Sequence, residues 1–453
     1  MRRLAILVAA FAGASLISVP GAACRAGELP NIVILYADDA GYADFGFQSI
    51  TDEAMEGLTP HIDSIASAGV RFTSAYMSGA VCSPSRAGML TGRYQQRFGH
   101  ELNIPPGYMK GGLPLTERTI ADRMKAAGYA TGIIGKWHLG YPPPYQPNRR
   151  GFDRFFGLLQ GSRPYFPMKK PTPHRVVQLN GEPTPESGYV TDRFGNGAVE
   201  FIKEHRDRPF FLYVSFTSPH GPLQAKASDL AKLAHIKDKR RRTYAGMVKC
   251  MDDNVGRILA TLRECGLENK TLVVFTNDNG GQTKTGAVNT PLKGHKGQIW
   301  EGGIRVPMSM RWPGKIAENT VVDDPVISLD FLPTFLAAAG VKPDPNWKLD
   351  GVNLLPRIMG KTDSISTRPI FWRIHGPNRE TAVRWNDWKL IQIDQNPGTK
   401  PLLFNLKDDI GETRDVADDH PELVAKLAGM LDAWESELID PLWRYSRRTR
   451  KKK

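Results

Sequence analysis

A single cysteine stands in a short segment whose neighbours favour chemistry at its sulfur. The run Cys82-Ser83-Pro84-Ser85-Arg86 is followed at a fixed distance by Leu90-Thr91-Gly92-Arg93. A rigid Ser-Pro turn and a nearby arginine are typical of a cysteine nucleophile with a lowered pKa. A buried structural cysteine at the start of a helix is the alternative, and for one cysteine alone it is the better interpretation.

Two pairs of oxygen-bearing side chains each follow an apolar run. Asp38-Asp39 comes after residues 31–36, and Asp278-Asn279 comes after residues 271–276. A turn or a helix cap explains either pair taken alone. Two such pairs with glycines close by favour a site for Ca²⁺, with Mg²⁺ as the second choice. Zinc is not indicated, because no His/Cys ligand spacing accompanies them.

The wider pattern around Cys82 resembles the signature of a known family. Cys-x-Pro-Ser-Arg-x-x-x-Leu-Thr-Gly-Arg, matched without a gap, is similar to the motif of the type I sulfatases of the alkaline phosphatase-like superfamily. In that family the cysteine is oxidised after translation to a formylglycine aldehyde. The resemblance implies that a formylglycine-generating maturation enzyme modifies Cys82, and it extends over most of residues 31–313.

Other segments match the family in the same order along the chain. Lys136 and His138 lie in Gly-Lys-Trp-His-Leu-Gly, His220 lies in Ser-Pro-His, and Lys296 lies in His-Lys-Gly-Gln-Ile-Trp-Glu-Gly-Gly. Taken alone, His220 is more often a turn histidine and Lys296 a solvated loop residue. Their shared order favours a catalytic site, in which Arg86 would hold the modified side chain.

The resemblance also implies a metal set and a mechanism. Residue 82 shares the metal with four side chains, which are Asp38, Asp39, Asp278 and Asn279. One hydroxyl of the hydrated aldehyde attacks sulfur, with Asp278 as base, and the cations stabilise the developing negative charge. His220, assisted by Lys296, protonates the leaving alcohol, and His138 takes a proton from the second hydroxyl to release sulfate.

Apolar runs alternate with helical segments along the chain. Strands are expected at 31–36, 70–72, 129–134, 210–216 and 271–276, and helices at 61–68, 119–127 and 244–262. This alternation predicts an α/β fold with a large, mostly parallel central sheet flanked by helices, which the resemblance identifies as alkaline phosphatase-like. The reactive segments follow strand carboxyl ends, where open α/β sheets place their ligand crevice.

The domain organisation follows from length and from a change of pattern. At 453 residues the chain is long enough for a main domain with an appendage. We place a catalytic domain at 24–365 and a small antiparallel sheet-plus-helix subdomain at 366–443. The subdomain strands are expected at 371–374, 382–385, 389–393 and 403–406, with a helix at 421–438. Glu301 to Pro307 is interpreted as mainly architectural.

The two ends of the chain carry processing and charge signals. Residues 1–23 contain two arginines, an apolar stretch and then a short segment of small residues typical of a cleavage site. This pattern predicts a signal peptide and an exported protein, periplasmic or secreted. A lipoprotein box at 21–24 is the weaker alternative. A stable membrane span is not expected, because the sequence contains no other long apolar run. Residues 444–453 form a basic tail.

Charge and cysteine content limit the partners. The net charge is +13, with further cations clustered at 237–242, but no nucleic-acid-binding motif accompanies them. A positive surface would attract polyanions such as sulfated carbohydrates, which we expect as substrates. Cys250 and Cys265 either pair or stay buried, and the sequence leaves both open.

Two loops, 141–144 and 164–185, are expected to rim the pocket. His100 and Arg163 are further rim candidates, with a structural role as the favoured alternative for each. Two rival functions remain open: a phosphodiester or phosphonate monoester hydrolase of the same superfamily, and an unmodified sulfated-glycan-binding homologue.

Overall fold

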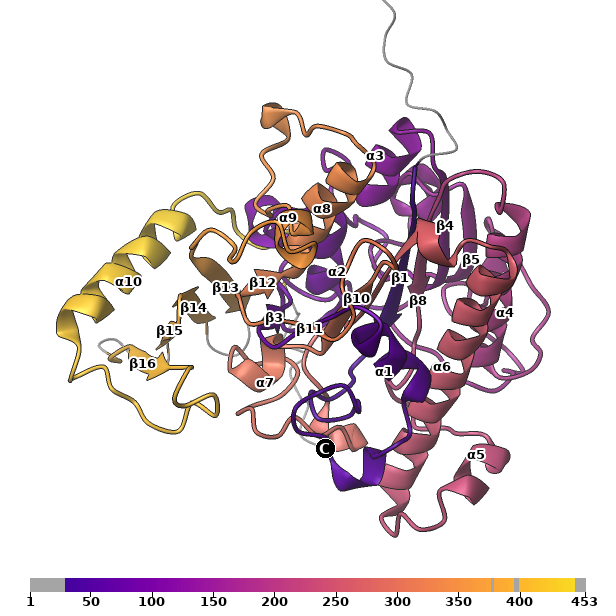
Figure 1. Ribbon diagram of the computed structural model, residues 1–453, viewed down its shortest axis with the longest axis horizontal. Coiled ribbons are helices and arrows are strands. Elements are labelled where there is room, and N and C mark those ends of the chain that lie inside the picture. Colours follow the sequence, from indigo (N-terminus) through magenta and orange to yellow (C-terminus); the bar gives the residue numbers. More distant parts are fainter. Residues whose placement is uncertain (1–28, 376–378, 395–398, 445–453) are drawn as a thin grey trace, which may run out of the picture.

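A computed structural model describes residues 29–375, 379–394 and 399–444 of the protein. A ten-stranded sheet forms its centre (Figure 1). Its five middle strands are all parallel, in the order β9 (Thr271–Asn277), β1 (Asn31–Ala37), β8 (Phe210–Ser215), β4 (Ala130–Lys136) and β5 (Arg154–Leu158). Antiparallel β10 (Met308–Arg311) leads on to β2 (Val70–Phe72) and β11 (Thr320–Val322) at one edge, and β6 (Gln178–Leu179) and β7 (Glu182–Pro183) form the other. The predicted mostly parallel sheet is confirmed.

Both faces of this sheet are covered by helices. Alternate side chains of β1 point to opposite faces, so Val33 and Leu35 pack in one core cluster and Ile32 and Ile34 in the other. The first cluster contains α1 (Pro60–Ser67), α4 (Val190–Glu204) and α6 (Lys239–Glu264); the last two lie side by side in Figure 1. The second contains α2 (Cys82–Thr91), α3 (Ile120–Ala126) and α8 (Phe331–Ala338).

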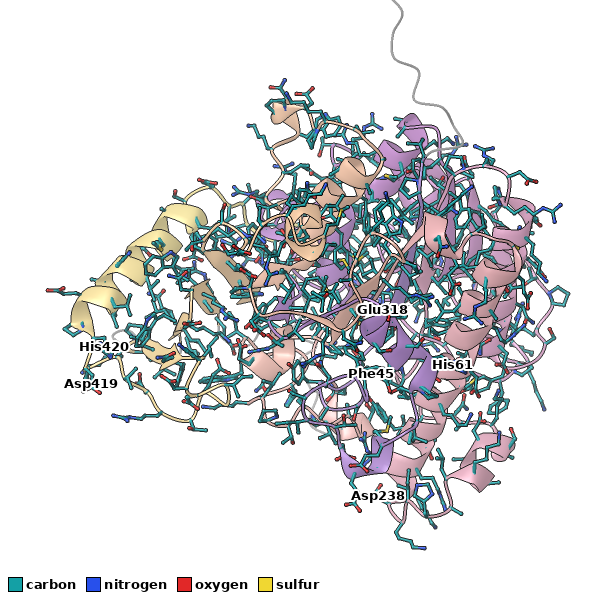
Figure 2. The ribbon with its side chains drawn as sticks, viewed as in Figure 1. Phe45, His61, Asp238, Glu318, Asp419 and His420 are labelled. Atoms are coloured by element: carbon teal, nitrogen blue, oxygen red, sulfur yellow. The ribbon has the colours of Figure 1, made fainter. Side chains whose placement is uncertain are left out.

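The C-terminal part forms its own antiparallel sheet, as expected. Its strands are β13 (Ile370–His375), β14 (Arg379–Trp385), β15 (Trp388–Asp394) and β16 (Leu402–Asn405), with α10 (Pro421–Glu435) against β14. This subdomain shares a core with α7 (Glu301–Ile304) and the short pair β3 (Ala75–Tyr76) and β12 (Val326–Ile327). Figure 2 shows Asp419 and His420 at its outer edge, far from His61 on α1.

Several expected boundaries differ from the structure. Helix α6 begins at Lys239 rather than Tyr244, because the Asp238 side chain accepts a hydrogen bond from the Arg241 backbone at 2.8 Å and caps the helix. Strand β4 continues to Lys136, which is therefore its last residue rather than the start of a loop. The domain limits at 24–365 and 366–443 stay predictions.

Other expectations concern single residues and the chain ends. Cys250 and Cys265 do not pair: both are free thiols, the first buried and the second half-buried. The predicted signal peptide, 1–23, and all but the first residue of the basic tail, 444–453, lie outside the described residues. Within the described part, no helix combines the length and apolar character needed to cross a bilayer.

A buried ion cluster joins the two parts of the protein. Lys389 of β15 lies 2.8 Å from Glu301 of α7 and 2.8 Å from Glu412, and all three side chains are fully buried. The Glu412 side chain also accepts a hydrogen bond from the Glu301 backbone, at the start of α7. Among the described residues, Lys389 is the one cation paired with Glu412.

We expect Lys389→Met to lower the free energy of unfolding by about 3–5 kcal/mol, because it leaves Glu412 buried without its cation. Urea and thermal unfolding followed by circular dichroism would measure the change. Lys407→Met, which alters an exposed lysine, is the matched control. Equal stability of the two variants would show that the cluster contributes little.

Candidate active site

Adjacent strands bring the two acidic pairs together. Strands β1 and β9 are in parallel register, with Ala37 opposite Asn277, so the residues that follow them meet at one edge of the sheet. The Asp39 backbone N–H donates to Asp278 Oδ1 at 3.1 Å, and Asn279 Nδ2 donates to Asp39 Oδ1 at 2.9 Å. All of these side chains are buried, so the predicted pairing of the two segments is confirmed in space.

Helix α2 places Cys82 beside these carboxylates. The helix begins at Cys82, and Pro84 is tolerated in its first turn because the N–H groups there have no partner within the helix. It ends at Thr91, and the capping residue Gly92 has a φ of 64°, the left-handed conformation that glycine adopts readily. Cys82 Sγ lies 3.6 Å from Asp38 Oδ1 and 3.2 Å from Lys296 Nζ.

Three cations neutralise the acidic cluster. Lys136 Nζ lies 2.6 Å from Asp38 Oδ2, and Lys296 Nζ lies 2.6 Å from Asp39 Oδ1. The third contact joins an Arg86 guanidinium nitrogen to Asp278 Oδ2 at 2.9 Å. Each of these side chains is at most 11% exposed, so water screens the charges only weakly.

These charges set the protonation of the cluster. Burial alone would raise the pKa of Asp278, but Arg86, Lys136 and Lys296 outweigh it and lower that pKa. Burial likewise opposes ionisation of Cys82, yet Lys136 and Lys296 lower the pKa of the thiol to about 7. The pocket therefore favours negative charge at residue 82.

Two histidines face the same pocket from different loops. His220 follows β8, and its Nδ1 donates to the Gly221 carbonyl at 2.7 Å, which leaves Nε2 directed at Asp39 Oδ2, 3.5 Å away. His138 follows β4 in a left-handed backbone conformation with a φ of 60°. Burial, followed by the charges of Lys136 and Arg86, lowers the pKa of His138, so this ring is neutral.

A cavity of about 280 Å³ opens above Cys82. Cys82, His138 and His220 line it. Carboxylates, cations, a nucleophile and two histidines at the carboxyl edge of a parallel sheet form a site for transfer of an anionic group.

Comparison with known families decides the type of transfer. A family model described as Sulfatase matches residues 30–341, and one described as N-sulphoglucosamine sulphohydrolase, C-terminal, matches residues 295–437. The chain belongs to the sulfatase family. It is therefore an enzyme that hydrolyses sulfuric esters, and the predicted family and activity are confirmed.

Individual relatives resemble this sulfatase over most of their length. N-acetylgalactosamine-6-sulfatase of Rattus norvegicus is 32% identical over 92% of this chain and 87% of its own. Arylsulfatase A of Homo sapiens is 35% identical over 88% of this chain and 85% of its own. The crystal structure of Ps i-CgsB in complex with k-i-k-neocarrahexaose superposes with a TM-score of 0.86 at 36% identity, covering 92% of this chain and 95% of that one.

The acidic cluster of the sulfatase fits a divalent cation. Ligand atoms of Asp38, Asp39, Cys82 and His220 all lie within 4.8 Å of one another. Asn279 Oδ1 is buried and accepts no hydrogen bond from the described residues. A buried acceptor without a donor, next to two carboxylates, is what an oxygen-ligated Ca²⁺ or Mg²⁺ requires.

The two rim candidates are not at the rim. His100 is fully buried behind α2, where its Nε2 lies 2.6 Å from Ser83 Oγ. Arg163 is 2% exposed and pairs with Glu186 at 2.5 Å, which gives it a structural role. Of the expected rim loops, Tyr141 lines the cavity, whereas no residue of 164–185 does.

Several cavity residues were missed by the sequence analysis. Asn103 and the segment Gln160 to Ser162 line the cavity and supply polar groups. Gln160 follows β5, a strand that the apolar run at 155–159 indicates in the sequence. Asn103 lies in an irregular loop, and no periodic pattern indicates it.

Gly161 contacts the ring of His138 closely enough to provide a test. A Cβ added at Gly161 would lie 2.4 Å from His138 Cε1, so Gly161→Ala must displace the ring. We expect kcat/KM for an aryl sulfate to fall roughly 10- to 100-fold, the cost of misplacing a catalytic group by about 1 Å. Steady-state kinetics would measure it.

Gly111→Ala is the matched control, since its nearest neighbour would be Tyr108 at 3.6 Å. An unchanged kcat/KM in Gly161→Ala would contradict the placement of His138 against Gly161.

Proposed function

We propose that this sulfatase removes sulfate from a sulfated carbohydrate through a formylglycine at position 82. The observation that carries the proposal is the position of Cys82, 3.6 Å from Asp38 and 3.2 Å from Lys296 at the cavity, within an intact Cys-Ser-Pro-Ser-Arg motif. The modification requires a maturation enzyme as a partner. We also propose export, on the pattern of residues 1–23.

The proposed cation is Ca²⁺, because the surrounding oxygens are hard ligands from carboxylates and an amide. Asp38, Asp39, Asp278 and Asn279 would hold it together with the modified residue 82. When bound, it would act as a Lewis acid that lowers the energy of negative charge on sulfate oxygens. The modified residue 82 would supply an oxygen nucleophile with a second hydroxyl for release of sulfate.

The side chains of the protein itself hold charge and move protons. Lys136 and Lys296 have fixed positions beside the acidic cluster, where they would stabilise charge that grows on a sulfate group. Burial disfavours the charged ring of His220, but the charges of Asp39 and Asp38 outweigh it and raise the pKa of His220 to about 9. His220, which lines the cavity, would therefore donate a proton from Nε2 to the leaving oxygen. His138, neutral and lining the same cavity, would accept a proton near residue 82.

The base role of Asp278 stays a prediction. Its Oδ2 accepts from Arg86 at 2.9 Å and its Oδ1 accepts from the Asp39 backbone at 3.1 Å. Both oxygens therefore have donors, an arrangement that suits a ligand or an orienting group better than a proton acceptor.

A carbohydrate substrate is supported by the cavity and by the relatives. Asn103, Gln160 and Ser162 offer amide and hydroxyl groups that match sugar hydroxyls. One relative is named as an N-acetylgalactosamine-6-sulfatase, and the matching crystal structure contains a neocarrahexaose.

Removal of divalent cations by a chelator is expected to lower kcat/KM by more than about 100-fold, because a metal contributes several kcal/mol of charge stabilisation. Adding Ca²⁺ should restore activity, and Mg²⁺ should restore less. Isothermal titration calorimetry of the stripped protein should show one Ca²⁺ site that Asn279→Ala weakens. Full activity after chelation, or recovery with Zn²⁺ in place of Ca²⁺, would contradict the proposed site.

Co-expression with a formylglycine-generating enzyme should convert Cys82 to the aldehyde, visible by mass spectrometry as loss of sulfur from its peptide. Turnover of an aryl sulfate should rise in proportion to the aldehyde fraction and disappear in Cys82→Ala. Cys265→Ala is the matched control, since this thiol lies outside the cavity. Equal activity of the unmodified thiol, or faster turnover of a matched aryl phosphodiester, would contradict the proposal.

A further inference from the structure

The residue after Cys82 is the junction of a buried hydrogen-bond chain. Ser83 is fully buried in the first turn of α2. Its Oγ lies 2.7 Å from the His138 carbonyl oxygen and 2.6 Å from His100 Nε2. Its backbone N–H donates to Asn103 Oδ1 at 2.9 Å. The hydroxyl therefore connects a histidine outside the cavity with a histidine that lines it.

The number of protons available fixes the direction of donation along these hydrogen bonds. A carbonyl oxygen only accepts, so the single hydroxyl proton of Ser83 must be donated to the His138 carbonyl. The Ser83 oxygen is then an acceptor toward His100, and His100 Nε2 must carry the proton of that contact. The order of donation is His100 to Ser83 to His138.

The surroundings of His100 agree with this tautomer. The ring is buried and packs edge-to-face against Trp443 at 4.7 Å. Burial, with smaller contributions from His138 and Arg150, lowers the pKa of His100 to about 3, so the ring is neutral with one proton. Its Nδ1, which carries no proton in this tautomer, has no hydrogen-bond partner among the described residues.

Packing alone does not explain a histidine at this position. A buried ring nitrogen without a partner costs free energy that an apolar side chain of similar size would avoid. A side chain that breaks a packing rule of this kind is often retained for function. The group of His100 that does have a partner is the Nε2–H directed at Ser83.

His138 needs backbone support. Its φ of 60° lies in the left-handed region, which a residue with a Cβ adopts only when its surroundings hold it there. Its backbone N–H donates to the Leu159 carbonyl at 3.1 Å, and its own carbonyl accepts from Ser83. These two contacts hold the peptide from both sides, and the ring that it carries lines the cavity.

We propose that His100 is a positioning residue: its Nε2–H holds the Ser83 hydroxyl on the His138 carbonyl and thereby orients the His138 ring at residue 82. This inference rests on the catalytic role of His138 proposed above. Within the part of the chain that the structure describes, His100 does not line the cavity, and its ring makes one side-chain hydrogen bond, to Ser83.

The test compares side chains that keep or remove the donor. His100→Leu removes the donor, whereas His100→Gln places an amide N–H near the position of Nε2. We expect kcat for an aryl sulfate to fall roughly 10- to 100-fold in His100→Leu with little change in KM, and to recover largely in His100→Gln. Activity is expressed per aldehyde-bearing chain, counted by mass spectrometry, because Ser83 adjoins the modified residue.

A double-mutant cycle makes the test independent of a general packing defect. Ser83→Ala should reduce kcat as His100→Leu does, and the double variant should be no slower than Ser83→Ala, because both changes break one chain. His235→Leu, at an exposed position, is the matched control. Should His100→Leu fail to fold in thermal melts, Ser83→Ala and His100→Gln carry the comparison.

The outcomes separate this inference from the proposed function. Loss of kcat in His138→Asn together with full kcat in Ser83→Ala would overturn the positioning role while leaving His138 catalytic. The positioning role would also be overturned if the fold-losses of kcat in the two single variants multiplied in the double variant. Equal losses of kcat in His100→Gln and His100→Leu would overturn it as well. Full activity of His138→Asn would instead remove the catalytic role on which the inference rests.

Discussion

The balance of buried charge at the carboxyl edge of the sheet is the constraint on which the structure depends. Asp38, Asp39 and Asp278 are buried away from water. A buried carboxylate without a partner costs several kcal/mol of folding free energy. Lys136, Lys296 and Arg86 each form an ion pair with one of these carboxylates. These cations come from a strand, a loop and a helix, so the site forms only when those elements are correctly packed. The same fixed charges suit a reaction in which an anion gains negative charge.

Much of this arrangement is predictable because it depends on contiguous sequence. Residues 31–36 and 271–276 are mostly apolar, which predicts two strands buried on both faces of a sheet, each followed by polar side chains at its carboxyl end. The resemblance to the sulfatases, in which the two segments share a metal, then placed Asp38 beside Asp278, and the parallel register of β1 and β9 brings them together. The position of Cys82 follows from the motif, whose proline suits the first turn of α2 and whose glycine at 92 suits its end. A motif whose own residues determine the local helix can be transferred from a family to a new sequence with its structure intact.

The rest depends on contacts that the sequence does not display. His100 is polar and follows a glycine, which suggests an exposed loop, yet α2 and Trp443 bury it completely. Arg163 lies in a basic stretch, but a carboxylate 23 residues further along the chain, at Glu186, pairs with it. The start of α6 was missed because basic residues at 239–242 resemble a solvated run, whereas the Asp238 side chain caps the helix there. Burial and capping of this kind are tertiary properties.

A crystal structure of the matured protein grown with Ca²⁺ tests the central claim most directly. The account predicts one cation, with oxygens of Asp38, Asp39, Asp278, Asn279 and the modified residue 82 about 2.3–2.6 Å away. Lys136, Lys296 and Arg86 should remain around the same carboxylates. A cation bound elsewhere, or carboxylates that turn away from residue 82, would contradict the account.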